Sequence, residues 1–146
     1  MILREALKND LKGILELYKQ LNSEDPILSD KIAENIWNEI FDCKYLKYFV
    51  AIENEMIVST CCISIIPNLS RNGRSYGVIE NVITHEEYRN LGIGKKIMMN
   101  AVEYAKKHNC YKIVLLSSTT RKEAHAFYEK IGFDGNSKKG FEIRFD

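Results

Sequence analysis

The chain has 146 residues, of which 45% are apolar and 28% charged. This is the composition of a globular protein, and it excludes a disordered tail. The 21 basic and 20 acidic residues nearly cancel, so we expect no general nucleic-acid-binding surface. The longest uncharged run, residues 56–70, is shorter than the roughly 20 residues of a membrane-spanning helix, and no signal-peptide block opens the sequence. We therefore expect one cytoplasmic domain over residues 1–146, with no membrane partner.

Helical and alternating apolar patterns follow one another along the whole chain, without a linker or repeat. The first part of the chain is predicted to form strand 3–6, a helix from Asn9 or Asp10 to about Asn22, and a helix capped by Ser29 or Asp30 that reaches Ile40. Strands 48–52, 56–66 and 76–84 follow, and then a long helix from the glycines at 92 and 94 to about His108. The last part is predicted to form strand 111–117, a helix from about Arg121 to Ile131 ended by Gly132, and strands near Phe133 and at 141–145. The fold class is therefore mixed α and β with a central sheet.

The four cysteines, Cys43, Cys61, Cys62 and Cys110, fit no zinc-binding spacing. We expect reduced thiols that pack as small core residues, and we expect no metal site. A catalytic cysteine would need a basic neighbour, and the sequence places none beside these residues.

A strand, a basic glycine turn and a long helix carry the most informative pattern. The turn is Arg89-Asn90-Leu91-Gly92-Ile93-Gly94-Lys95. A helix N-terminus exposes unpaired backbone N–H groups and the positive end of the helix dipole, which suits an anion. Glycines at 92 and 94 let a phosphate approach the backbone, and Arg89 and Lys95 add positive charge. The pattern predicts a phosphate-bearing ligand.

Two commoner phosphate motifs do not fit this turn. A P-loop requires glycine where Arg89 stands and Ser or Thr where Lys96 stands. A dinucleotide-binding fingerprint requires a third small residue where Ile97 stands. A plain glycine turn that only starts a helix is the remaining alternative.

The motif Arg89-x-x-Gly92-x-Gly94 resembles the acetyl-CoA signature of the GNAT (Gcn5-related N-acetyltransferase) superfamily. The block 124–133, in which Tyr128 precedes a Gly-Phe pair, is similar to the end of that family's pattern. The resemblance implies a mixed, mostly antiparallel sheet of six to seven strands, about four flanking helices, and parallel strands 76–84 and 111–117 that splay apart. It also implies acetyl-CoA as cosubstrate, a small-molecule amine as partner, and often a homodimer.

The same resemblance implies roles for residues that would contact acetyl-CoA. The turn 89–95 would hold its pyrophosphate, and the backbones of Val82 and Ile83 would contact the pantetheine arm, with the Val82 N–H polarising the acetyl carbonyl. The sequence has Arg121 where many relatives have an asparagine that holds this arm. Arg121 could contact a phosphate instead.

Glu80 interrupts an otherwise largely apolar strand, and a carboxylate in such a place is usually paired or functional. A protonated amine must lose a proton before it attacks, and a carboxylate can accept that proton. Residues 79–82 resemble the strand of amino-sugar acetyltransferases in which this glutamate lies beside the substrate. We expect Glu80 to be the general base, with a structural ion pair as the alternative.

Tyr128 lies on an amphipathic helix, where a tyrosine is usually a core residue. The family places there a general acid that protonates the departing thiolate, so the resemblance makes Tyr128 the expected acid. Three further residues are candidates for binding the acceptor: Trp37, which could wall the amine pocket or be core, and Arg71 and Arg74, which could bind an acidic group or be solvated.

The expected function is transfer of an acetyl group from acetyl-CoA to the primary amine of a small molecule, by direct attack in a ternary complex. A protein or peptide N-acetyltransferase is one alternative. A non-catalytic acyl-CoA sensor on the same fold is another, although Glu80 and Tyr128 together argue against it.

Overall fold

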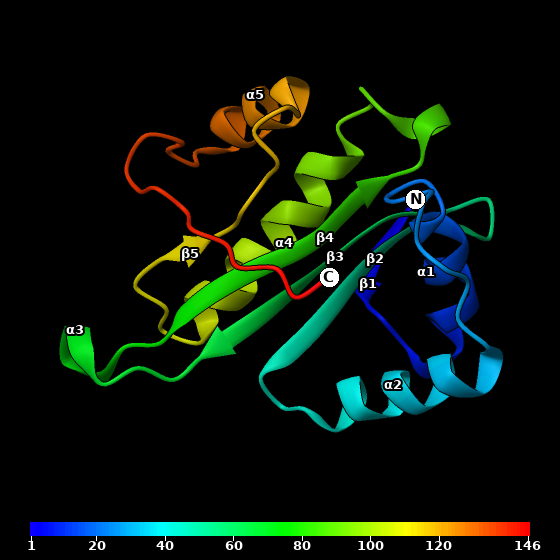
Figure 1. The fold of residues 1–146 in the computed structure, drawn as a ribbon, viewed down its shortest axis with the longest axis horizontal. Coiled ribbons are helices and arrows are strands. Elements are labelled where there is room, and N and C mark those ends of the chain that lie inside the picture. The colour runs from blue at the N-terminus through cyan, green and yellow to red at the C-terminus, as the bar shows by residue number, and fades with distance from the viewer. The chain divides into compact units, whose positions relative to one another are not determined.

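A five-stranded sheet in the order β1-β2-β3-β4-β5 organises the computed structural model (Figure 1), which describes residues Met1–Asp146. The chain divides into two units, Met1–Val114 and Leu115–Asp146, and all five strands belong to the first. The strands are β1 (Ile2–Glu5), β2 (Leu46–Glu53), β3 (Met56–Ile66), β4 (Tyr76–Thr84) and β5 (Ile113–Val114). The helices of this unit are α1 (Leu11–Tyr18), α2 (Asp30–Asp42), the single turn α3 (Ser70–Gly73) and α4 (Ile93–Lys107), with 3-10 turns at Lys8–Asp10 and Glu86–Tyr88.

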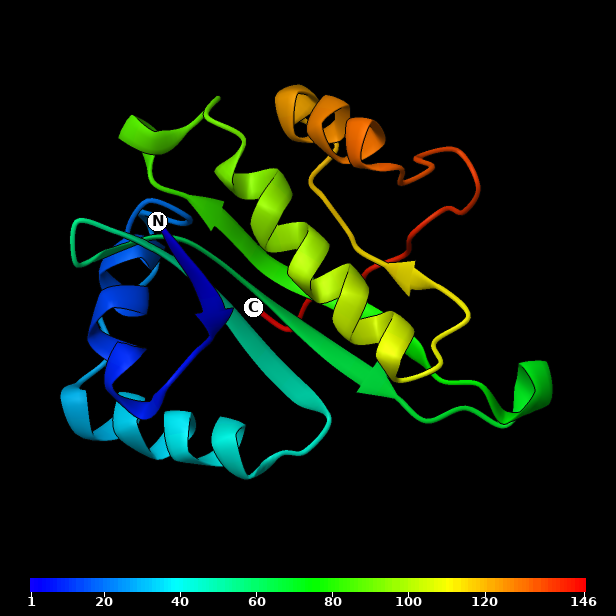
Figure 2. The same cartoon turned by 180° about the vertical axis from the view of Figure 1, so that it is seen from behind.

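Strands β1 to β4 are antiparallel neighbours, and β5 runs parallel to β4. The side chains of each strand alternate between the two faces of the sheet, and helices cover both faces. On one face Cys61 donates its S–H to the backbone carbonyl of Ile97 in α4, and the rings of Phe49 and Tyr104 are in edge contact at 5.8 Å. Helix α4 lies along β3 and β4 on this side (Figure 2).

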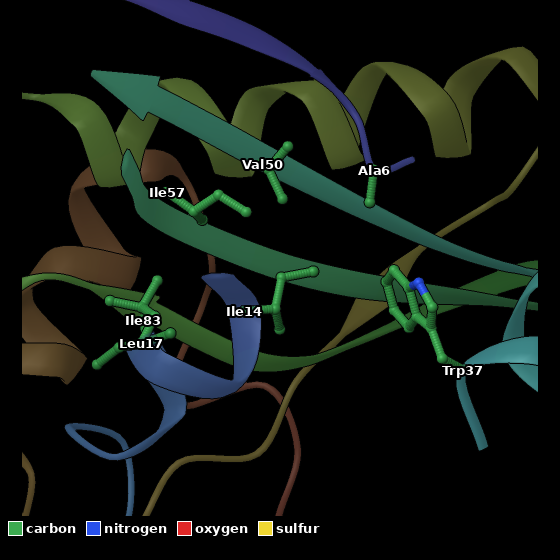
Figure 3. Packing of buried hydrophobic residues seen from close by; sticks show 7 residues of the cluster. All are labelled: Ala6, Ile14, Leu17, Trp37, Val50, Ile57 and Ile83. Carbon is green, nitrogen blue, oxygen red and sulfur yellow. The ribbon is translucent and has the colours of Figure 1, made fainter. Parts of the chain in front are cut away.

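The opposite face carries the main hydrophobic cluster under α1 and α2. Figure 3 shows how side chains from the two helices meet those of the strands. The cluster consists of Ala6, Ile14, Leu17, Trp37, Val50, Ile57 and Ile83. It explains the apolar stripe of the first predicted helix, because Ile14 and Leu17 are the buried residues of α1.

Most of the helix ends predicted from the sequence are confirmed. The Ser29 side chain accepts a hydrogen bond from the Ile32 N–H at 3.3 Å and so caps α2. Helix α1 is shorter than predicted, because it ends at Tyr18 and turns replace the expected last helical turn. The Asp10 carboxylate accepts from the Arg4 guanidinium at 2.6 and 3.0 Å and from the Leu7 N–H at 2.6 Å, which fastens the start of α1 to β1.

A bulge interrupts the pairing of β3 with β4. Thr60 pairs with Ile83 and Cys62 with Glu80, so the single residue Cys61 faces both Asn81 and Val82. Asn81 has a φ of 53°, in the left-handed region that asparagine tolerates better than most residues. The extra residue brings Glu80 and Ile83 onto the same face of the sheet.

The second unit contains one helix, α5 (Lys122–Ile131), which ends at Gly132 as predicted. Gly132 has a φ of 121°, a backbone conformation that favours glycine. The strands predicted near Phe133 and at 141–145 are not formed, so the sheet has five strands instead of six or seven. Alternation alone cannot make a strand without a partner edge, and Phe141, Ile143 and Phe145 are exposed instead. The mixed α/β architecture itself is confirmed.

None of the helices is long and apolar enough to cross a membrane.

Candidate active site

The predicted phosphate-binding turn joins the end of β4 to the start of α4. Gly92 is the N-cap of α4 and has a φ of 78°, and Asn90 has a φ of 61°, so the backbone turns sharply twice before the helix begins. The Arg89 Nε–H donates to the Thr84 carbonyl at 3.1 Å, which ties the turn to the strand and leaves the terminal nitrogens of Arg89 for other partners. The side chains of Arg89 and Lys95 are exposed.

The exposed N-terminal amides of α4, a left-handed glycine and a nearby guanidinium are the groups that a pyrophosphate requires. These residues therefore fit coenzyme A at the turn.

One edge of β4 has no partner over most of its length. Strand β5 pairs with β4 only at Gly77 and Val78, so residues 79–84 of β4 are without a ladder partner on that side. This agrees with the predicted splaying of the two parallel strands, although β5 is shorter than the expected 111–117. Val82 lies within the bulge, and the Ile83 side chain is buried in the main cluster. A backbone role for both residues is compatible with these positions.

Glu80 lies at the end of a row of side chains that crosses three strands. Tyr48 pairs with Cys62, and Cys62 pairs with Glu80, so the three side chains share the face of α1 and α2. Glu80 is exposed, whereas Cys62 is buried and donates its S–H to the Glu80 backbone carbonyl at 3.4 Å. The Glu80 carboxylate takes part in no ion pair, so the structural alternative for Glu80 has no counterpart in this structure.

The floor beside Glu80 is polar but uncharged. Burial raises the pKa of Cys62 to about 11 and that of Tyr48 to about 12, so both groups remain protonated at neutral pH. Burial also raises the pKa of Tyr18, whose hydroxyl is shielded from solvent and has no hydrogen bond of standard geometry, although the Tyr48 hydroxyl is close enough to affect it. Neither cysteine on β3 is an activated nucleophile, because burial also raises the pKa of Cys61.

Trp37 is placed beneath the site as a core residue. It is 4% exposed, its indole N–H donates to the Lys8 carbonyl at 2.9 Å, and its ring is in edge contact with Tyr48 at 5.2 Å. Trp37 therefore meets the row of Tyr48, Cys62 and Glu80 through the ring of Tyr48.

Arg71 and Arg74 lie at the other end of β4, in and beside α3. The Arg74 guanidinium donates to the carbonyls of Asn109 and Cys110 at 3.3 and 3.0 Å, so it fastens the α3 turn to the segment before β5. Arg71 is exposed and its guanidinium lies 5.6 Å from the centre of the Tyr111 ring. Of the two arginines, Arg71 has the freer side chain.

Tyr128 and Arg121 belong to the second unit. Tyr128 is buried, and its ring contacts those of Phe127 and Phe133 at 5.3 and 6.1 Å. Arg121 is the exposed N-cap residue of α5, and its carbonyl accepts from the His125 N–H at 3.1 Å.

A model of the acetyltransferase (GNAT) family matches residues 11–133. The chain belongs to this family. It is therefore an acetyl-CoA-dependent acyltransferase, and the resemblance of the glycine turn to the family signature is confirmed at the level of the family.

Several relatives match over nearly the whole chain. Glucosamine 6-phosphate N-acetyltransferase of Trypanosoma brucei brucei is 31% identical over 142 residues, which are 94% of this chain and 91% of the relative. A protein of Agrobacterium tumefaciens str. C58, described as an acetyltransferase, has a solved structure with 43% identity and a TM-score of 0.94, covering 99% of both chains. The structure of glucosamine-6-phosphate N-acetyltransferase from Arabidopsis thaliana has 27% identity and a TM-score of 0.89, covering 99% of this chain and 98% of that one.

Some residues of the site were not singled out from the sequence. Tyr48, Cys62 and Asn81 join Glu80 only through strand pairing and the bulge, which the apolar pattern does not reveal. An asparagine inside a strand was the one available signal, since asparagine often occupies the left-handed region.

Proposed function

We propose that the protein transfers the acetyl group of acetyl-CoA to the primary amine of a small molecule, by direct attack in a ternary complex. The observation that carries this proposal is the position of Glu80, which is exposed and takes part in no ion pair. It lies on β4 next to the bulge that contains Val82, where the far edge of the strand has no partner. The names of the relatives support an amino sugar phosphate as the acceptor, and glucosamine 6-phosphate is the first to test.

In the proposed reaction Glu80 accepts a proton from the ammonium group, directly or through water. The neutral nitrogen attacks the thioester carbonyl, and the Val82 N–H stabilises the charge that develops on the carbonyl oxygen. The carbon–nitrogen bond forms, which leaves the nitrogen with two protons and a positive charge. As the carbon–sulfur bond breaks, the thiolate takes a proton from the Tyr128 hydroxyl, and the surplus proton of the nitrogen restores that hydroxyl through water. The products are the acetamide and free coenzyme A. The turn 89–95 holds the pyrophosphate, and Arg121 is a further candidate for a phosphate contact.

The direct test measures release of free thiol from acetyl-CoA with glucosamine 6-phosphate, glucosamine, other small amines and lysine peptides. We expect a small amine to be acetylated much faster than any peptide, with N-acetylation of the product confirmed by mass spectrometry. Faster transfer to the peptides would support a protein acetyltransferase. Thiol release at background with all acceptors, together with tight acetyl-CoA binding, would support a sensor.

Two substitutions test the assigned roles. Glu80→Gln removes the base, so we expect kcat to fall by about a hundredfold while the dissociation constant for acetyl-CoA is unchanged. Tyr128→Phe removes the acid with little change in shape, and we expect a smaller fall in kcat, again with unchanged acetyl-CoA binding. Wild-type turnover by either variant would overturn that residue's role. Glu34→Gln on α2 is the matched control, because Glu34 is likewise exposed and takes part in no ion pair.

A further inference from the structure

Two tyrosine rings and two cations gather at the end of β4 farthest from the glycine turn. The Lys112 ammonium lies 5.4 Å from the centre of the Tyr76 ring and 5.3 Å from that of Tyr111. The two rings are in edge contact at 6.4 Å, and the Arg71 guanidinium lies over Tyr111 at 5.6 Å. We call these four residues the Lys112 cluster.

The cations of the Lys112 cluster have no acidic partner. None of the chain's ion pairs involves Lys112 or Arg71, so their charge is balanced only by the negative faces of the rings. Ring contacts on two sides hold the ammonium in place but leave it able to donate hydrogen bonds. A cation that contacts aromatic rings and has no counter-ion is suited to bind an anion from solution.

The turn that carries Arg71 is fixed from both sides. Three consecutive residues, Arg71, Asn72 and Gly73, have φ values of 56°, 59° and 71°. The Asn68 side chain donates to the carbonyls of Ser70 and Arg74, both at 3.1 Å, and Arg74 in turn binds the carbonyls of residues 109 and 110. The turn is therefore positioned by hydrogen bonds to present Arg71 beside Lys112.

Two residues of the cluster, Tyr76 and Lys112, share their face of the sheet with Glu80. Gly77 pairs with Ile113 on the α4 face, where a Cβ on Gly77 would lie 3.4 Å from the Ile113 side chain. The neighbouring residues Tyr76 and Lys112 therefore point to the opposite face, and alternation places Val78 and Glu80 on that face too. The Cα atoms of Tyr76 and Glu80 are about 13 Å apart, because a strand rises about 3.3 Å per residue.

We propose that the Lys112 cluster binds the anionic group, a phosphate or carboxylate, of the acceptor whose amine lies at Glu80. This inference rests on the proposed function. This face of β4 then has a carboxylate at Glu80 and cations beside Tyr76, and it selects an acceptor that carries both an amine and an anion within about 13 Å.

Coenzyme A also carries phosphates, but its expected position is at the other end of the strand. The nine residues of β4 separate Tyr76 from the turn that begins after Thr84, a span of about 26 Å. The cluster is therefore assigned to the acceptor, and the kinetics of the two substrates distinguish the two sources of phosphate.

The test uses two acceptors with the same amine, glucosamine 6-phosphate and glucosamine. Lys112→Met keeps the apolar length of the side chain and removes its charge. We expect the KM for the phosphorylated acceptor to rise about tenfold, and that for glucosamine and for acetyl-CoA to stay the same. Lys112→Arg is expected to restore most of the preference, and Arg71→Met to show a smaller loss than Lys112→Met.

Lys107→Met is the matched control, because Lys107 is an exposed lysine on α4 without an ion pair, and its loss changes the net charge equally. It should leave the preference for the phosphorylated acceptor unchanged. Equal changes with both acceptors in Lys112→Met would overturn the inference and leave the proposed function intact. A rise in the KM for acetyl-CoA instead would assign the cluster to the cosubstrate and also overturn it.

A second measurement does not depend on turnover. Titration of the whole protein with inorganic phosphate, followed by amide NMR, should shift the signals of Tyr76, Tyr111 and Lys112, and Lys112→Met should abolish these shifts. If no amine is acetylated but phosphate binds here, the proposed function fails and the anion site stands. Absence of any shift in the wild type would remove the anion site, whatever the acceptor is.

Discussion

Cys62 and Tyr48 lower the stability of the protein when the pH becomes alkaline. Their pKa values are raised by burial to about 11 and about 12, above the ordinary values of 9.0 and 10.0. Their contribution is therefore complete below about pH 9 and is lost as the pH rises, because the unfolded chain gives up these protons first. Cys62 contributes a slope of up to about 1.4 kcal/mol per pH unit, and the partly exposed Tyr48 contributes less.

We expect the free energy of unfolding, measured by chemical denaturation between about pH 8 and pH 11, to fall less steeply in Tyr48→Phe/Cys62→Ala than in the wild type. Tyr45→Phe/Cys43→Ala removes an exposed tyrosine and an exposed cysteine and is the matched control, with an unchanged slope. If the free energy of unfolding fell equally steeply with pH in all three proteins, Tyr48 and Cys62 would not be the buried protonated groups beside Glu80.

Asp10 is a second residue on which stability depends. Its carboxylate is 7% exposed and accepts three hydrogen bonds, and the Arg4 guanidinium is the main reason that its pKa is lowered. Asp10→Asn leaves Arg4 without its partner, so we expect the free energy of unfolding to fall by about 2 kcal/mol near neutral pH. The same substitution at an exposed ion pair, Glu16→Gln, should cost less than about 0.5 kcal/mol in the same denaturation experiment.

At the scale of elements, the turn before α4 depends on the conformation of Gly92. No atom lies within 4 Å of a Cβ built on Gly92, so only its φ of 78° opposes a side chain there. Gly92→Ala should lower stability by about 1 kcal/mol and, by moving the amides of the turn, weaken acetyl-CoA binding in calorimetry. Gly73 has a similar φ of 71° and equally open surroundings, so Gly73→Ala should cost similar stability without changing acetyl-CoA affinity.

The elements could be predicted where local pattern and tertiary packing agree. The Ser29 cap, the Gly132 end of α5 and strands β3 and β4 follow from residues whose preferences the packing satisfies. The end of α1 at Tyr18 could not be predicted, because the apolar spacing continues to Leu21 although the buried face ends near Leu17. The register of Ile83 relative to Glu80 depends on the bulge, and the position of the α3 turn depends on the hydrogen bonds of Arg74 to residues 109 and 110, which are distant in sequence.

For the whole molecule, the division into two units predicts where folding stability resides. The five strands and the main cluster lie in 1–114, whereas Tyr128 is the one buried residue of 115–146. We expect fragment 1–114 to unfold cooperatively in a thermal melt followed by circular dichroism. Fragment 115–146 should show no transition, because so short a chain buries too little apolar surface. A fragment 1–114 without cooperative unfolding would show that its core requires the rest of the chain.

The extra residue in β4 sets the two parts of that strand out of phase with each other. Up to Glu80 the even-numbered side chains point toward α1, and beyond Val82 it is Ile83 that does so. Glu80 and Ile83 are three positions apart, so a regular strand would turn them to opposite faces, and the bulge is what allows both to point toward α1. Removing Asn81 would leave Glu80 and Ile83 two positions apart in a regular strand, so we expect both side chains to keep their face and only the bulge to be lost.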